Sequence, residues 1–376
     1  MIKDNNYYLA LDLGTGLGTK LALFKGTQLQ ISEDILKVEE YGSGFDSYTT
    51  VLEEKIYSFI KKNKMSIRQI SSAGIASAGI LKSDGAFQLI QNFPSFNGFN
   101  LKKNIEEKFE LPVAIDNDAN AGGLAEWSVL RMEILYWVFG GGWGGVWISK
   151  NGDVKFPSRD WNGNDNSLHP TNEPGYVIPL YKLDLKSLFY EIGASYERFE
   201  KLLFEEKGEP ALIGPCENDD SIRAEFILSG PGRCRLFRAI VGDDNFYERF
   251  LDITEAEKMT DPSVAGEYIS KLSGMRVESA INTDRLYGKI LAYATREMLR
   301  KSKKDGMPDN IPICLGGKPS YALPYFGPST QRVLGKMGFM NYLRPSVIDE
   351  RGINANLMGA AVLASKAIGV IKSTGT

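Results

Sequence analysis

A strand, a glycine-rich turn and a second strand occur twice in this chain, and this repeated unit constrains the fold more than any other feature. The first copy, over residues 7–24, reads YYLALDL, GTGLGT and KLALF. The second copy, over residues 134–149, reads ILYWVF, GGGWGG and VWIS. Glycine supplies the positive φ angles of such turns without a Cβ clash, and the flanking residues favour strands. Helical material follows each copy, so the pattern predicts two similar α/β lobes.

The remaining elements follow from the spacing of apolar residues. Helices are predicted at residues 46–62, 101–109, 285–303 and 356–368. Further strands are predicted at residues 73–78, 112–115, 154–156 and 311–315. Segments rich in Asn, Asp, Gly and Pro predict loops at residues 91–100 and 157–176.

Composition narrows the class of protein. A chain of 376 residues with 43% hydrophobic and 24% charged residues is typical of a globular protein of two domains. A net charge of −3 gives no reason to expect nucleic acid or an anionic membrane as a partner. Neither a signal peptide nor an apolar run long enough to span a bilayer is recognised. The scattered Cys216, Cys234 and Cys314, with His169 as the one histidine, indicate reduced thiols, no structural zinc and a cytoplasmic location.

The first glycine turn is a candidate phosphate site. Backbone N–H groups of a tight glycine turn can face phosphate oxygens, and nearby hydroxyls add donors. A carboxylate beside such a turn can hold Mg²⁺ through water; here it is Asp12. The candidate residues are Asp12, Gly14, Thr15, Gly16, Thr19 and Lys20. An ordinary glycine-rich hairpin is the alternative.

Two further glycine segments are candidate nucleotide contacts. Gly140, Gly141 and Gly142 open a loop with more glycines than a hairpin requires, which favours close approach to a phosphate. Gly316 and Gly317 follow an apolar strand and could let adenine lie against the backbone. The alternatives are that Gly140–Gly142 only reverse the chain and that Gly316 and Gly317 only end the strand.

The most informative segment is Asp116-Asn-Asp-Ala-Asn120, which follows a buried strand and precedes a helix. Open α/β sheets bind ligands at the carboxyl ends of their strands. A carboxylate there, within reach of an alcohol, can act as a general base. The alternative is that Asn117 or Asp118 only caps the helix.

In this order, the segments resemble the sugar kinases of the ROK family and the related bacterial glucokinases. The most specific pieces are IDNDANA at residues 115–121 and EFILSGPG at residues 225–232, and the likeness covers nearly the whole chain. Two positions depart from the family pattern. Gly141 stands where the second phosphate motif has threonine, and Tyr176 stands where the Glu-x-Gly-His motif has histidine. The zinc-binding cysteine cluster of many ROK proteins is missing.

The resemblance implies an α/β protein with the two-lobed, ribonuclease H-like (actin/hexokinase) ATPase fold and a cleft between the lobes. A small lobe of residues 1–116 would be completed by the helix at 354–376, and residues 117–353 would form the large lobe. The implied reaction is ATP- and Mg²⁺-dependent phosphorylation of a hexose or hexose derivative, with the C6 hydroxyl as the expected acceptor and Asp118 as the base. The sugar contacts implied are Asn92, Asn117, Glu173, Tyr176 and Glu225.

Three other functions compete with this interpretation. A ROK repressor would carry a helix-turn-helix before the first phosphate motif, which here begins at residue 12. A chaperone-like ATPase of the same fold would not carry the Asn-Asp sugar signature. A degenerate relative that binds sugar without turnover stays open because of Gly141 and Tyr176. The identity of the sugar, the phosphate donor and a homodimeric state stay open as well.

Overall fold

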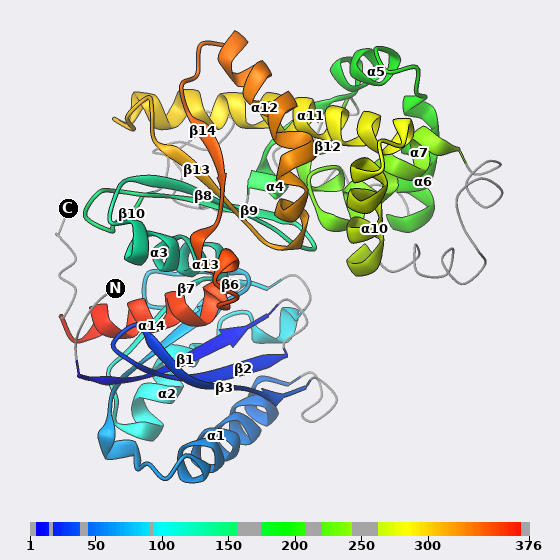
Figure 1. Ribbon diagram of the computed structural model, residues 1–376. Helices are drawn as coiled ribbons and strands as arrows, with labels where there is room; N and C mark the ends of the chain where they lie inside the picture. Colours follow the sequence, from blue (N-terminus) through cyan, green and yellow to red (C-terminus); the bar gives the residue numbers. More distant parts are fainter. Residues whose placement is uncertain are drawn as a thin grey trace. The chain divides into compact units, whose positions relative to one another are not determined.

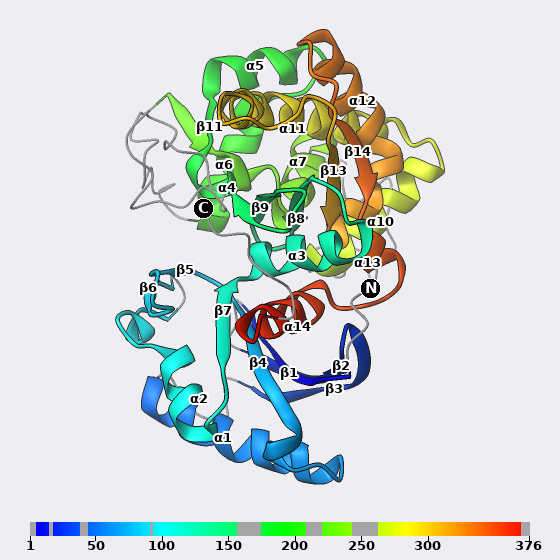
Figure 2. The same ribbon diagram turned by 90° about the vertical axis from the view of Figure 1, so that its left-hand side faces the viewer.

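The computed structural model describes residues 5–14, 18–37, 44–90, 93–155, 174–207, 220–242 and 262–369. Contacts between residues divide the chain into two compact units (Figures 1 and 2). Unit 1 comprises Met1–Tyr136, Val146–Lys155 and Ser346–Thr376, and unit 2 comprises Trp137–Gly145 and Phe156–Pro345. The segment after residue 116 lies in unit 1, although we expected the boundary of the small lobe there. The division into functional lobes stays a prediction.

Unit 1 contains a five-stranded sheet in the order β3-β2-β1-β4-β7. Its strands are β1 Tyr7–Leu13, β2 Thr19–Lys25, β3 Gln28–Leu36, β4 Ile70–Ser77 and β7 Val113–Asn117. The pairs β1–β2 and β2–β3 are antiparallel, whereas β1–β4 and β4–β7 are parallel. The strands predicted in this part of the chain are confirmed. Only β3 has no counterpart among them.

Helices cover both faces of this sheet (Figure 1). These are α1 Phe45–Lys62 and α2 Leu101–Phe109 on one face and α14 Ala355–Ala367 on the other, where α3 Asp118–Leu130 packs on α14 and α13 Val347–Glu350 packs on α3. The predicted helices at 46–62, 101–109 and 356–368 are therefore confirmed. Apolar side chains of α1 and α2 form one core with β1, β2 and β4. On the other face, α14 packs against β1, β4 and α3.

Small residues let α14 approach its neighbours closely. A methyl group on Gly74 of β4 would lie 1.8 Å from the carbonyl oxygen of Ala360 in α14. A methyl group on Gly359 would lie 1.9 Å from the carbonyl oxygen of Ala121 in α3. Contacts this short exclude a side chain at either position, so the small-residue pattern of residues 356–368 reflects packing of backbone against backbone.

The second sheet has the order β10-β9-β8-β13-β14. Its strands are β8 Ile134–Phe139, β9 Trp143–Ile148, β10 Val154–Lys155, β13 Pro312–Gly316 and β14 Tyr342–Pro345. The division between the units passes through β8 and β9. Counted along the chain, the strands of both sheets follow the same order, third-second-first-fourth-fifth. This confirms the prediction of two similar α/β lobes.

The remaining elements of unit 2 are mostly helical. They are α4 Pro174–Val177, α5 Lys182–Tyr190, α6 Tyr196–Lys207, α7 Gly230–Val241, α10 Pro262–Gly274, α11 Glu278–Lys304 and α12 Leu323–Lys336, with the strands β11 Pro179–Tyr181 and β12 Ser221–Arg223. The helix predicted at 285–303 is confirmed and is longer. A hairpin of β5 Ile80–Leu81 and β6 Phe87–Leu89 completes unit 1. Among the described helices, none combines the length and apolar character needed to cross a membrane.

Candidate active site

The parallel strands of unit 1 bring two acidic segments to the same edge of its sheet. In the register of the sheet, Asp12 of β1 pairs with Ala76 of β4, and Ala76 pairs with Asp116 of β7. The three strands run in the same direction, so Asn117 and Asp118 continue from the edge at which β1 ends. The prediction that polar residues stand at the carboxyl end of a strand is confirmed, although the middle three residues of β7 are half-buried and not fully buried as expected.

Asn117 is the N-cap of α3. Its side-chain oxygen accepts a hydrogen bond from the backbone N–H of Ala119 at 2.8 Å, and its amide donates to the carbonyl of Gly79 at 3.0 Å. The capping alternative is therefore correct for this residue. A sugar contact by Asn117 stays a prediction.

Asp118 is the first residue of α3 and is half-buried. Burial raises the pKa of its carboxyl to about 6, and the negative charge of Asp12 acts in the same direction. The backbone N–H of Ala119, which donates to Oδ1 at 2.9 Å, opposes this shift. A carboxylate whose pKa lies this close to neutrality is suited to accept a proton, since general bases work best near the operating pH.

Asp12 is 7% exposed, and both of its carboxylate oxygens accept amide hydrogens. Asn354 Nδ2 donates to Oδ2 at 3.1 Å, and Asn356 Nδ2 donates to Oδ1 at 3.0 Å. Burial raises the pKa of Asp12, while the two amides and Lys20 lower it. The sequence interpretation missed both asparagines as site residues and assigned their segment only to a helix.

Two carboxylates on one sheet edge fit the preference of Mg²⁺ for hard oxygen ligands. Mg²⁺ usually keeps several waters and contacts the protein through one or two carboxylates. Asp12 already accepts two amide hydrogens, so a water-mediated contact to the ion suits it better than a direct one. The described residues, this edge included, contain no group of three or more His, Cys, Asp or Glu side chains placed to bind a metal, so one carboxylate with waters is the arrangement that fits here.

The carboxylate of Asp116 accepts hydrogen bonds from residues of its own turn. Its Oδ1 accepts from Asn120 Nδ2 at 2.6 Å and from the backbone N–H of Asn117 at 2.8 Å. Burial raises its pKa, and these two hydrogen bonds counteract the rise. Asp116 and Asn120 therefore hold the turn that presents Asp118, which explains why polar residues are so dense in this segment.

The first glycine turn is described in part. The N–H of Gly14 donates to the carbonyl of Gly18 at 3.2 Å, which closes the turn. Thr19 is buried, and its hydroxyl is 2.9 Å from that of Tyr48 in α1. The predicted hydroxyl contact of Thr19 with phosphate is therefore not supported, because the side chain points into the core. Lys20 is exposed, with its Nζ 3.9 Å from Asp34 Oδ1.

In unit 2, the second glycine turn lies beside a predicted sugar contact. A methyl group on Gly142 would lie 3.1 Å from Glu225 Oε2, whereas Gly140 and Gly141 have nothing within 4 Å of an added methyl group. The N–H of Gly230, at the start of α7, donates to the carbonyl of Gly140 at 2.9 Å. The backbone at Gly140 and Gly141 is thus open on its Cβ side, as a phosphate-binding turn requires.

Gly317 has a structural reason to be glycine. Its φ is +82°, and a methyl group there would lie 1.9 Å from the carbonyl oxygen of Phe139 in β8. Close approach to β8 accounts for this glycine without a ligand. Gly316 is buried at the end of β13. The predicted contact of both residues with adenosine stays a prediction.

Several predicted residues lie outside the described part of the chain: Thr15, Gly16, Asn92 and Glu173. Tyr176 is in α4, but its side chain is not described. The neighbouring Gly175 is packed against the Cβ of Glu225 and the backbone oxygen of Trp143, each 2.9 Å from an added methyl group. This packing keeps the backbone at Gly175 beside Glu225.

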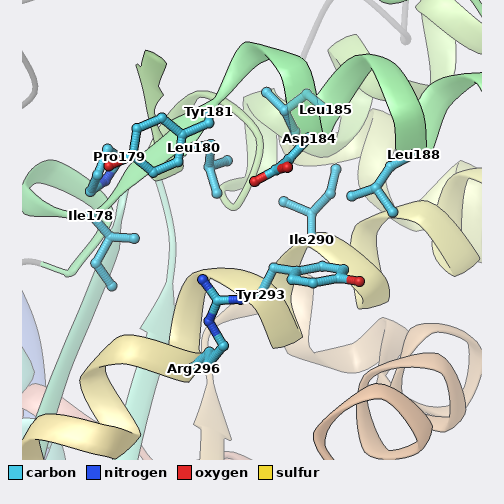
Figure 3. Close-up of a pocket in the computed structure, with 10 residues that line it drawn as sticks. All are labelled: Ile178, Pro179, Leu180, Tyr181, Asp184, Leu185, Leu188, Ile290, Tyr293 and Arg296. Carbon is cyan, nitrogen blue, oxygen red and sulfur yellow. The ribbon is translucent and has the colours of Figure 1, made fainter. Parts of the chain in front are cut away.

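One pocket of unit 2 contains none of the predicted residues (Figure 3). Side chains of β11, α5 and α11 line it, and the carboxylate of Asp184 and the rings of Tyr181 and Tyr293 border it. The lining residues are Ile178, Pro179, Leu180, Tyr181, Asp184, Leu185, Leu188, Ile290, Tyr293 and Arg296.

Sequence comparison identifies a family over the first part of the chain. The model of the ROK family matches residues 8–153. The xylose repressor of Caldicellulosiruptor bescii is 28% identical over 125 residues, which are 33% of this chain and 31% of the repressor. The chain thus matches about a third of that relative's length.

Solved structures extend the likeness of the fold to nearly the whole chain. A proposed sugar kinase from Cytophaga hutchinsonii has a TM-score of 0.66 at 14% identity, covering 95% of this chain and 99% of that one. A ROK family transcriptional regulator, a homolog of the E. coli MLC protein, has a TM-score of 0.65 at 17% identity, covering 98% and 81%. A ROK family glucokinase from Streptomyces griseus, solved with glucose and AMPPNP, has a TM-score of 0.59 at 15% identity, covering 96% and 100%.

The chain therefore matches the ROK family in sequence over residues 8–153 and has the two-lobed actin/hexokinase fold of the ROK kinases.

Proposed function

We propose that this protein is an ATP-dependent sugar kinase that transfers a phosphoryl group to a hexose hydroxyl, with C6 as the expected position. The observation that carries the proposal is Asp118, a carboxyl with a pKa of about 6 at the start of α3, beside the second acidic group Asp12. The relation to a glucokinase that binds glucose and AMPPNP, an ATP analogue, supports the same reaction.

Asp118 would accept the proton of the sugar hydroxyl as the hydroxyl oxygen attacks the γ-phosphate. The bond between that oxygen and phosphorus forms while the bond to the leaving oxygen of ADP breaks. Removing such a base typically costs about 10²–10⁴-fold in rate. Asp116 and Asn120 hold the turn in which Asp118 lies, so the carboxylate is positioned before substrate arrives.

Mg²⁺ bound near Asp12 would neutralise charge that develops on the transferred phosphoryl group. The backbone at Gly14 and at Gly140–Gly142 would contact the phosphates, together with Thr15, Gly16 and Lys20. Glu225, next to the second turn, would accept hydrogen bonds from sugar hydroxyls. Asn92, Asn117, Glu173 and Tyr176 complete the proposed sugar contacts, and Gly316 and Gly317 the adenosine contacts.

A coupled assay of ADP release over a panel of hexoses, amino sugars and N-acetyl sugars tests the proposal. We expect Mg²⁺- and sugar-dependent ADP release by the parent, and a loss of about 10²–10⁴-fold in Asp118→Asn with sugar binding retained. Asp46→Asn, which changes an exposed carboxylate of α1, is the matched control. ADP release by Asp118→Asn at the parental rate would refute the role of Asp118.

A sugar-binding protein without turnover is the second candidate. The match to a xylose repressor and the fold shared with a ROK transcriptional regulator favour it. Gly141 and Tyr176, which depart from the kinase pattern, are compatible with it. Calorimetry with the same sugars distinguishes the two candidates. Micromolar binding of a sugar that elicits no ADP release would mean that the protein is a regulator or a degenerate relative and not a kinase.

A further inference from the structure

The carboxylate of Asp12 is held from two sides by the beginning of the last helix. Asn354 and Asn356 each donate one amide hydrogen, and each uses a different oxygen of Asp12. Asp12 lies 342 residues before Asn354 and 344 residues before Asn356, so these contacts exist only in the folded unit 1. Two donors on separate oxygens fix both the position and the rotation of a carboxylate, which one donor does not.

The orientation of Asn354 is itself fixed. It is the N-cap of α14, and its side-chain oxygen accepts from the backbone N–H of Leu357 at 2.9 Å. With the oxygen committed to the cap, the amide nitrogen must point to the other side, where it meets Asp12. One side chain therefore caps the start of the helix and holds the carboxylate.

The helix that carries both donors has little freedom to move against the sheet. Gly74 and Gly359 mark places where the backbone of α14 contacts β4 and α3 without intervening side chains. Ser72 of β4 adds a hydrogen bond from its hydroxyl to the carbonyl of Ala364 at 2.7 Å. Because β4 pairs directly with β1, the helix that holds the two donors and the strand that holds Asp12 are both fixed to β4.

Amides hold a carboxylate without cancelling its charge. An ionised carboxylate has about four acceptor sites, so two amide hydrogens leave room for metal-bound water. A lysine at the same place would compete with a cation, and a carboxylate would repel Asp12. Neutral donors are the residues that orient Asp12 and leave its negative charge available.

We propose that Asn354 and Asn356 are positioning residues that hold Asp12 for its water-mediated contact with Mg²⁺ and thereby set the affinity of the protein for Mg-nucleotide. This inference rests on the proposed function, which assigns Mg²⁺ to Asp12. Outer-shell partners of metal sites typically contribute about 10–100-fold to metal affinity.

The test compares calorimetric binding of ADP with and without Mg²⁺, which requires no turnover. The variants are Asn356→Ala and Asn354→Ser; serine keeps an N-cap oxygen that can accept from Leu357 N–H but lacks the amide group that donates to Asp12. Asn100→Ser is the matched control, since Asn100 is the N-cap of α2 and accepts from Lys103 N–H at 2.9 Å. Asp12→Asn gives the value expected when the metal contact is lost.

We expect Mg²⁺ to tighten ADP binding to the parent and to Asn100→Ser equally. In Asn356→Ala and Asn354→Ser this tightening should fall by about 10–100-fold, with the affinity for ADP alone unchanged. A loss of stability would weaken both measurements, so their ratio isolates positioning. If Asp12→Asn abolishes the tightening and both asparagine variants retain it, the inference is wrong while the proposed function stands. If Mg²⁺ does not affect ADP binding to the parent, the proposed function and the inference both fail.

Discussion

Asp118→Asn should make the protein more stable at neutral pH while it removes activity. The pKa of Asp118 rises from 3.8 to about 6 on folding, mainly because burial disfavours the charged form. At a pH above both values, the folded protein must hold an ionised carboxylate in an unfavourable place. At about 1.4 kcal/mol for each unit of pKa, this costs about 3 kcal/mol of unfolding free energy. An asparagine has the same shape, does not ionise and can still accept from the N–H of Ala119.

The effect has a defined dependence on pH. Between pH 3.8 and about 6 the folded state retains a proton that the unfolded chain has lost. The stability of the parent therefore falls as pH rises through this window, and the variant does not share this fall. The advantage of Asp118→Asn should be up to about 3 kcal/mol near pH 7 and should nearly vanish near pH 4.

Urea unfolding followed by tryptophan fluorescence at about pH 4 and pH 7 measures this difference. Comparing variant with parent at each pH removes the contributions of all other titrating groups. Asp46→Asn, at an exposed position of α1, should show no gain that depends on pH. If Asp118→Asn is less stable than the parent at pH 7, or if its advantage is equal at both pH values, burial of Asp118 does not cause the shift and the reasoning is refuted.

Three further predictions concern the pH dependence of activity, the packing of α14 and a buried ion pair. If the catalytic carboxyl titrates at about 6, kcat/KM for the best sugar should fall about tenfold per pH unit below that value, and a flat profile would contradict a base of this pKa. Gly359→Ala places a methyl group 1.9 Å from the carbonyl oxygen of Ala121 and should strongly lower the thermal midpoint, whereas Gly335→Ala, with open space around it, should leave the midpoint unchanged or slightly higher. Arg233 Nη2 lies 2.7 Å from the buried carboxylate of Asp284, so Arg233→Met leaves this charge without its ion-pair partner and should lower the free energy of unfolding in urea by about 3–5 kcal/mol. The double variant Arg233→Met, Asp284→Leu removes both charges and should restore most of this loss.

Local patterns were enough to predict most of unit 1. The strands β1 and β4 are largely buried and rich in apolar or small residues, β7 opens with three apolar residues, and the apolar side chains of α1 and α2 repeat at helical spacing. The strand β3 was not predicted because it is largely exposed and polar residues interrupt its apolar ones, so that no continuous apolar run marks it. Parallel pairing then brings Asp12 and the Asp116–Asp118 turn to one edge, as expected for polar residues at strand ends.

Contacts across the whole chain could not be predicted in this way. Nothing in the local sequence of Asn354 or Asn356 indicates that they meet a residue of the first strand, since only folding brings them together. Thr19 is a different case, because the alternation of side chains along β2 predicts which way it points. It shares a face of β2 with Leu21 and Leu23, which lie in the core, and Lys20 points the other way. Applying that period to the turn would have removed Thr19 from the phosphate site.

The packing of α14 on β4 also has a consequence during synthesis. Ser72 of β4 bonds to Ala364, which is made 292 residues later. At translation rates of about 5–20 residues per second, roughly 15–60 s pass before the partner of this strand emerges from the ribosome. During that time the face of β4 at Gly74, which α14 covers in the folded protein, is exposed. The period in which the growing chain most needs a chaperone should therefore end only when residues 355–367 have been made.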